Sequence, residues 1–201
     1  MANSGWPVTS SIVIDELAQE GQVIDWRHRI ELGNEGLAYI SQVARPITKL
    51  WKLSDFTQAS DGGYVLPADY IGPCSISLKG GSCFEWVPPE DFSQDDYGTY
   101  TITENKLYIA VSDSEVQDVR IRAYASLPEI TSDTPVNDPL LMIPPIGTYL
   151  LAYYILMRFP ASPDVPRELA RASKYAKMFM ETLPIFEEAC RARESEAYSR
   201  N

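Results

Sequence analysis

Alternation of apolar and polar residues marks the middle of the chain, from residue 64 to residue 128. Residues 75–79 and residues 83–87 both alternate, and Gly80-Gly81 separates the two runs. A period of two on either side of a Gly-Gly pair is typical of a β-hairpin. The pattern therefore predicts two antiparallel strands that turn at Gly80-Gly81.

Further strands are predicted on both sides of this hairpin. Residues 100–102 and 107–111 flank a turn at Glu104-Asn105, residues 119–124 form a last alternating strand, and Thr48–Phe56 is the first extended segment. About five strands with one apolar face require another layer to cover that face. We expect the helices that flank this region to supply it.

Apolar residues at helical spacing occur before and after the strands. Four helices are predicted: from a cap at Thr9–Ser11 to Gly21, from Asp25 to just before Pro46, from Pro144 to about Phe159, and from a cap at Ser162 or Asp164 onward, with Pro166 near its first turn. The third should be buried among the other helices, because its apolar residues lie on nearly every side. The stripe of the last helix comprises Leu169, Ala172, Tyr175 or Ala176, Phe179, Leu183 and Phe186. Gly33 and Gly36 predict a close helix crossing. Pro184 should kink or split the last helix, because its ring clashes with the preceding turn.

These elements predict an α+β protein. The N- and C-terminal helices, in residues 1–47 and 129–201, should form a helical bundle, and residues 48–128 an inserted antiparallel β lobe, within one folding unit. The proline-rich stretch from Pro128 to Pro145 should be an irregular strap that leads back to the helices. Pro88–Phe92 should be a short helical turn whose Phe92 packs under the sheet.

Charge is distributed unevenly along the chain. The 201 residues carry 17 basic and 28 acidic side chains, a net charge of −11. Residues 55–118 hold twelve of the acids and only two lysines, whereas residues 167–201 are close to neutral. An acidic surface repels phosphate, which argues against nucleic-acid binding by the β lobe. The acids form either a solvated face or a surface that nucleic acid passes without sticking.

Cysteine use and hydropathy favour a soluble protein from a reducing compartment. Cys74, Cys83 and Cys190 lack the spacing of a metal site, and an odd number of cysteines fits a reducing environment. A disulfide between Cys74 and Cys83 across the hairpin is conceivable, but buried thiols are the default interpretation. The N-terminus lacks the pattern of a signal peptide. The longest apolar run is short of the roughly 20 residues that cross a bilayer.

No catalytic, cofactor or metal site is expected. The sequence contains no phosphate-binding glycine loop, no nucleophile motif and no His-Glu-x-x-His motif. Its single histidine, His28, stands between two arginines without nearby acids, which favours a structural role. An enzyme would have to act through Glu85, Glu90 and Asp91, which lack the spacing of a carboxylate metal loop.

The order of these segments resembles a known family. The segments that carry the resemblance are Tyr64-Val-Leu-Pro-Ala-Asp-Tyr70, Phe84-Glu-Trp-Val87, Pro89-Glu-Asp-Phe92, Tyr100-Thr-Ile102, Asn105-Lys-Leu107, Val119-Arg-Ile-Arg122 and the helical C-terminal third. In this order they resemble the head-to-tail adaptor proteins of short-tailed, podovirus-like bacteriophages, over roughly residues 9–195. Gly80-Gly81, where the family often has Asn-Gly, and Pro184 depart from the family pattern.

The resemblance implies a structural virion protein at the head-tail junction, assembled in the host cytoplasm. Its implied protein partners are further copies in a homo-oligomeric ring, usually of twelve, a portal protein above the ring and a tail nozzle protein below it. DNA is expected to pass through the ring without specific binding. No contact of the protein with a membrane is expected. Portal contacts are expected from Arg191, Arg193, Tyr198 and Arg200. An acidic lumen or rim is expected from Glu85, Glu90, Asp91, Asp95 and Asp96.

A carbohydrate-binding or host-recognition module of a phage tail is the alternative function. Trp51, Trp86 and Tyr108 would then form an exposed aromatic platform on the sheet. Because the three rings stand within apolar alternation, they are also compatible with a place in the core or in an interface.

Overall fold

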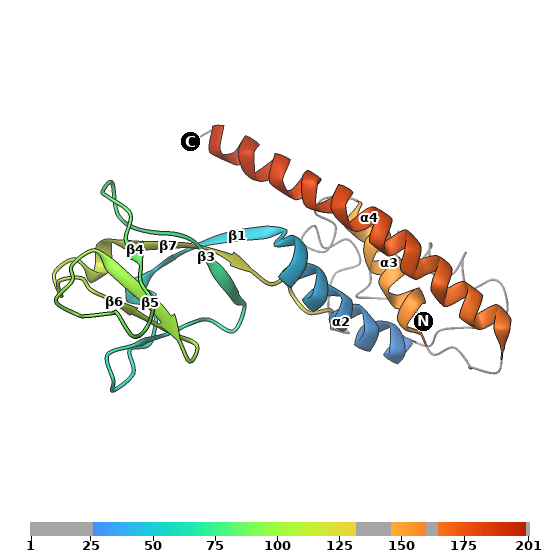
Figure 1. Ribbon diagram of the computed structural model, residues 1–201, viewed down its shortest axis with the longest axis horizontal. Helices are drawn as coiled ribbons and strands as arrows, with labels where there is room; N and C mark the ends of the chain where they lie inside the picture. The colour runs from blue at the N-terminus through green and yellow to red at the C-terminus, as the bar shows by residue number, and fades with distance from the viewer. Residues whose placement is uncertain (1–25, 132–145, 160–164, 200–201) are drawn as a thin grey trace. The chain divides into compact units, whose positions relative to one another are not determined.

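The computed structural model of the chain describes residues 26–131, 146–159 and 165–199 (Figure 1). The helix predicted from Thr9–Ser11 to Gly21, most of the proline-rich strap and the predicted start of the last helix before residue 165 lie outside these residues. The described elements combine three α-helices with two β-sheets, which confirms the α+β class. The chain divides into a helical unit, residues 1–47 with 126–201, and a β unit, residues 48–125.

The helical unit is built around α3 (Gly147–Arg158). Eight of its twelve residues are buried, among them Leu150, Leu151 and Ile155. A helix that is apolar on nearly every side must be covered by other elements. The cover comes from α2 (Trp26–Ala44) and α4 (Pro166–Ser199), and this arrangement confirms the prediction that the third helix is a buried core element.

Gly36 of α2 marks the predicted close helix crossing. A Cβ atom at this position would lie 2.8 Å from Tyr154 Cδ1 and 3.0 Å from Leu151 Cδ1, both on α3. Only hydrogen fits into that space, so glycine lets the two helices approach each other. The phenol of Tyr154 donates a hydrogen bond to Glu35 of α2 at 2.9 Å. Arg158 reaches the same carboxylate at 2.7 Å.

The predicted stripe of α4 is buried from Tyr175 onward, but Leu169 is 46% exposed. Pro184 does not split the helix, which is continuous from Pro166 to Ser199. Proline in a helix interior costs about 3 kcal/mol or more. Leu183 and Phe186, on either side of Pro184, are buried in the helical core, and their packing holds the helix together.

Two sets of side-chain hydrogen bonds, which we call polar brackets, join the part of the helical unit before the β unit to the part after it. The side-chain amide of Asn34 donates to the carbonyl of Ile130 at 3.0 Å, and its oxygen accepts from the Ile130 N–H at 2.7 Å. The hydroxyl of Ser41 donates to the Leu37 carbonyl at 2.6 Å and accepts from the Leu127 N–H at 2.9 Å. These bonds anchor the start of the strap to α2.

The β unit contains two sheets. The first sheet has the order β1-β7-β3, with β1 (Ile47–Lys52), β7 (Val119–Ala125) and β3 (Tyr70–Leu78). The second has the order β2-β6-β5-β4, with β2 (Tyr64–Val65), β6 (Lys106–Ile109), β5 (Thr99–Thr103) and β4 (Glu85–Trp86). The predicted β5–β6 hairpin is confirmed. Glu104 and Asn105 adopt φ angles of 51° and 59°, which suit a tight hairpin turn.

The two sheets cover each other, which corrects the prediction that helices cover a single sheet. Ile76 and Ile121 of the first sheet share one buried cluster with Leu107 and Ile109 of the second. In β7 buried residues alternate strictly with partly exposed ones, as predicted. The core of this unit is therefore a layer between two sheets.

Two predicted extended segments end early. The strand predicted over Thr48–Phe56 ends at Lys52, and Leu53–Asp55 form a 3₁₀ turn that buries Leu53 completely. The hairpin at Gly80-Gly81 turns as predicted, but its second arm pairs with β3 only near Cys83. The chain then joins the second sheet, where β4 runs parallel to β5. Sheet pairing within the β lobe is thus not wholly antiparallel, because β4 completes the edge of the other sheet.

Candidate assembly surfaces

The acidic residues predicted for a lumen or rim lie in one segment, which begins with β4 and continues toward β5. Their side chains are all exposed: Glu85, Glu90, Asp91, Asp95 and Asp96. Tight backbone turns shape the segment, with the Asp91 N–H donating to the Pro88 carbonyl at 3.0 Å and the Asp96 N–H to the Ser93 carbonyl at 3.2 Å. Within the described residues, no lysine or arginine lies within ion-pair distance of these five carboxylates. We call residues 85–96 the acidic segment.

Phe92 attaches the acidic segment to the second sheet. Its ring lies 6.4 Å from that of Tyr108 on β6, between ring centroids, as predicted for a side chain packed under the sheet. Pro88–Asp91 form a single turn and not a helix. Tyr108 points away from the core, because its neighbours Leu107 and Ile109 point into it. The acidic segment therefore covers the outer face of the second sheet.

The residues predicted to contact the portal fall at the C-terminal end of α4. Arg191 and Arg193 are exposed, and Arg191 lies 3.7 Å from the carboxylate of Glu187. Tyr198 belongs to α4, but its side chain lies outside the described part of the structure, as does all of Arg200. Gly147, the first residue of α3, packs beside Phe186. The last turns of α4 therefore continue beyond the start of α3.

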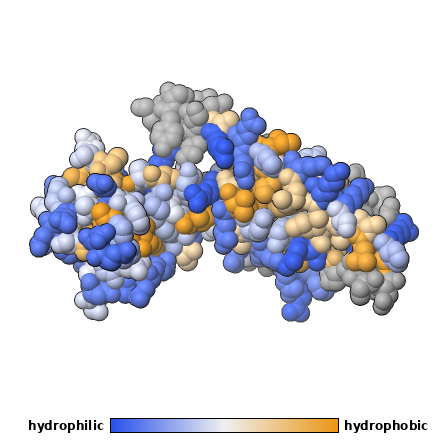
Figure 2. Space-filling model, viewed as in Figure 1, coloured by the Kyte–Doolittle hydropathy of each residue, from blue (hydrophilic) through white to orange (hydrophobic). Residues whose placement is uncertain are grey.

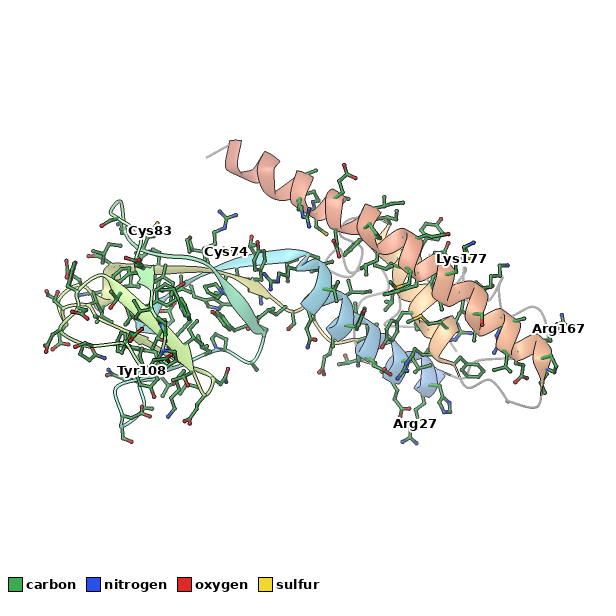
Figure 3. The ribbon with its side chains drawn as sticks, in the orientation of Figure 1. Arg27, Cys74, Cys83, Tyr108, Arg167 and Lys177 are labelled. Atoms are coloured by element: carbon green, nitrogen blue, oxygen red, sulfur yellow. The ribbon has the colours of Figure 1, made fainter. Side chains whose placement is uncertain are left out.

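A polar cluster on the second sheet was not predicted. Asp61 accepts hydrogen bonds from Lys106 at 2.6 Å, from Tyr108 at 3.1 Å and from the Gly63 N–H at 3.1 Å (Figure 3). The hydrogen bond from Lys106, followed by that from the Gly63 backbone, lowers the pKa of Asp61 from 3.8 to about 2. The cluster holds the loop before β2 against β6. The Asp-Gly-Gly turn was visible in the sequence, but its partner 45 residues away was not.

The three aromatic rings proposed as a carbohydrate platform do not share a face. Trp86 is in register with Tyr100, and Tyr100 with Ile109, whereas Tyr108 is in register with Thr101. Side chains in register point to the same face of a sheet, so Trp86 and Tyr108 point to opposite faces. Trp51 lies in the first sheet, beside Tyr70. This separation removes the structural basis for that alternative.

The family comparison gives the chain its place among known proteins. The model of the family described as SU10 adaptor protein matches residues 9–201, nearly the whole sequence. The chain belongs to the SU10 adaptor protein family. The match confirms the resemblance to phage head-tail adaptors, and the family consists of structural virion components rather than enzymes. No curated protein matched the chain significantly.

The cysteines, the groups able to bind metal and the hydropathy of the helices complete the description of this adaptor. All three cysteines are free: Cys190 is buried, Cys74 is half-buried and Cys83 is exposed. The prediction of buried thiols is therefore wrong for Cys83, which lies beside the exposed Gly80-Gly81 turn (Figure 3). Among the described residues, no three His, Cys, Asp or Glu side chains are grouped closely enough to hold a metal ion. None of the described helices is both long and apolar enough to span a membrane.

Proposed function

We propose that this adaptor forms a ring, of twelve copies as the family resemblance implies, that joins the portal to the tail nozzle and surrounds part of the channel for DNA ejection. The match over residues 9–201 to an adaptor family carries the proposal. The ring assembles in the host cytoplasm, before DNA ejection, and is retained in the virion at the head-tail junction.

The end of α4 is the proposed portal contact. With 34 residues, α4 is roughly 50 Å long. Among the α4 side chains that the structure describes, Cys190 is the last buried one, and Arg191 and Arg193 follow it with exposed side chains. A helix end of this kind can enter a groove on a partner without disturbing the core of the adaptor.

The acidic segment is the proposed lumen or rim of the ring. Its five carboxylates lie on exposed backbone and belong to a β unit with twelve acidic and six basic side chains. The repulsion between such a surface and phosphate keeps DNA from binding during passage.

Native mass spectrometry of the adaptor mixed with its cognate portal tests the function. We expect a complex of fixed stoichiometry that is lost on deletion of residues 191–201, which leaves Cys190 and the buried stripe intact. Arg191→Glu with Arg193→Glu should weaken the complex. Lys177→Glu is the matched control, because Lys177 is 77% exposed on the same helix. Binding that survives the deletion would disprove the portal contact, and a chain that ignores the portal would disprove the function.

A further inference from the structure

The two outer faces of the β unit carry opposite charge. In the first sheet, every charged residue of β1, β3 and β7 is basic: Lys49, Lys52, Arg120 and Arg122. The acidic segment covers the outer face of the second sheet through Phe92 and Tyr108. Because the sheets pack against each other through one core, these two faces lie on opposite sides of the unit.

Side-chain alternation places three of the four cations on the outer face of the first sheet. Val119, Ile121 and Ala123 of β7 point into the core, so Arg120 and Arg122 point outward. On β1, Trp51 packs against the core, so Leu50 and Lys52 point outward. We call Leu50, Lys52, Arg120, Arg122 and Tyr124 the basic face. Lys49 is excluded, because it is two positions from Trp51 on β1 and therefore lies on the same side of the strand as Trp51.

The basic face also contains exposed apolar surface. On the side of the β unit that Figure 2 presents, apolar residues lie among polar ones. Leu50 is 69% exposed, the highest value among the large apolar residues of the described structure. Tyr124 lies partly exposed on the central strand β7. Contacts with phosphate are made by cations and hydrogen-bond donors and do not require apolar side chains, whereas protein interfaces combine apolar and aromatic side chains with arginine. The composition of the basic face therefore favours a protein partner over DNA.

From these observations we infer that the basic face of one copy docks against the acidic segment of the next copy. This inference rests on the proposed ring. A contact between two different faces is heterologous, and it closes into a ring when the rotation between successive copies permits. Opposite charges on the two faces attract neighbours in one orientation and repel a contact between two like faces. The acidic segment would then lie at the boundary between copies, where the part that the neighbour leaves uncovered still faces the lumen or rim.

Two charge-reversed variants test the pairing. The first carries Lys52→Glu and Arg122→Glu on the basic face, and the second carries Asp91→Lys and Asp95→Lys on the acidic segment. Arg120 is left unchanged because its guanidinium donates to the Gln117 carbonyl at 2.7 Å. Lys79→Glu, at the exposed turn before Gly80, is the control outside both faces. Circular dichroism establishes that each variant is folded.

Sedimentation velocity of the full chain, alone and bound to the portal, measures the association. Each reversed variant should associate about tenfold or more weakly than the wild type, and added salt should weaken wild-type association. An equimolar mixture should regain association, because each acidic face then meets a basic one. The regained rings must alternate the two variants and contain an even number of copies.

Several results would overturn the inference. The inference would be wrong if both variants associated as strongly as the wild type, or if an equimolar mixture of the two did not regain association. If the ring forms in spite of the charge reversals, the proposed function stands while the inference fails. Fluorescence anisotropy with a labelled duplex DNA tests whether the basic face binds DNA instead of a second copy. Binding of DNA that is lost with Lys52→Glu and Arg122→Glu, while association is unchanged, would assign the basic face to DNA. A wild type that forms no ring, alone or with the portal, would refute the proposed function as well.

Discussion

Replacement of Gly36 by alanine tests the helix crossing on which the helical unit depends. The added methyl group would lie 2.8 Å from Tyr154 Cδ1 and 3.0 Å from Leu151 Cδ1. Neither side chain can yield easily, because both are buried in the core. The ring of Tyr154 clusters with those of Tyr39 and Phe179, at centroid distances of 5.8 and 5.6 Å. The contact must therefore be relieved by a shift of the helices.

Two opposing effects decide the magnitude of the Gly36→Ala change. Alanine is favoured over glycine in a helix interior by about 1 kcal/mol. Overpacking of a well-filled core costs about 1–3 kcal/mol. Because the contact involves two buried side chains, we expect the overpacking cost to prevail. The difference between the two effects should lower the free energy of unfolding by up to about 2 kcal/mol, and the melting temperature by up to about 8 °C for a chain of this size.

Thermal and urea unfolding, followed by helical circular dichroism, measure this effect. Ala38→Gly is the matched control, because Ala38 is exposed on the same helix and the substitution exchanges the same two residue types in reverse. It should lower the free energy of unfolding by about 1 kcal/mol through helix propensity alone. If Gly36→Ala raised stability by as much as Ala38→Gly lowered it, the close approach of α2 and α3 would be refuted.

Three further predictions concern single side chains. A maleimide should modify Cys83 first and Cys190 last, because Cys83 is exposed while burial raises the pKa of Cys190 to about 11. Mass spectrometry measures the order of labelling, and labelling of Cys190 before Cys83 would contradict the burial of Cys190. Asp61, whose pKa falls from 3.8 unfolded to about 2 folded, stabilises the β unit above pH 4 and loses that contribution between about pH 4 and 2. The free energy of unfolding should therefore fall less between about pH 4 and 2 in Asp61→Asn than in the wild type. An equal fall in both proteins would disprove the contribution of Asp61. Asn34→Ala should lower the free energy of unfolding by about 1–3 kcal/mol in urea titrations, because it leaves both backbone groups of Ile130 without their partner, and a neutral effect would refute the bracket.

The sequence predicted those elements that short-range patterns determine, such as a hairpin turn or a strand of alternating residues. The β5–β6 hairpin followed from alternation around Glu104-Asn105, and β7 from its apolar residues at every second position. The switch of β4 into the second sheet could not be predicted, because its two residues gain their partners from β5, more than ten positions away. Pro184 does not split its helix, because packing from other elements holds the helix together, and such packing cannot be read from the local sequence.

The same distinction applies to the candidate surfaces. Charge can be counted in a sequence, so the acidic segment and the arginines after Cys190 were found directly. Which face the acidic segment covers depends on the contact between Phe92 and Tyr108, 16 residues apart. The strands of the first sheet carry only basic charged residues. This cannot be recognised from the sequence, because β1 and β7 are distant along the chain and become neighbours only in the sheet.

The brackets from α2 to the strap have a consequence for the order of folding. The hydrogen bond between Ser41 and Leu127 closes a loop of 86 residues that contains the whole β unit. Closing a flexible loop of that length costs about 4 kcal/mol of chain entropy. Helical proteins usually fold quickly because their contacts are local, but here α2 must wait for partners about 90 to 120 residues further along the chain. On the ribosome, α2 is therefore synthesised long before its packing partners, and the helical unit completes its core last.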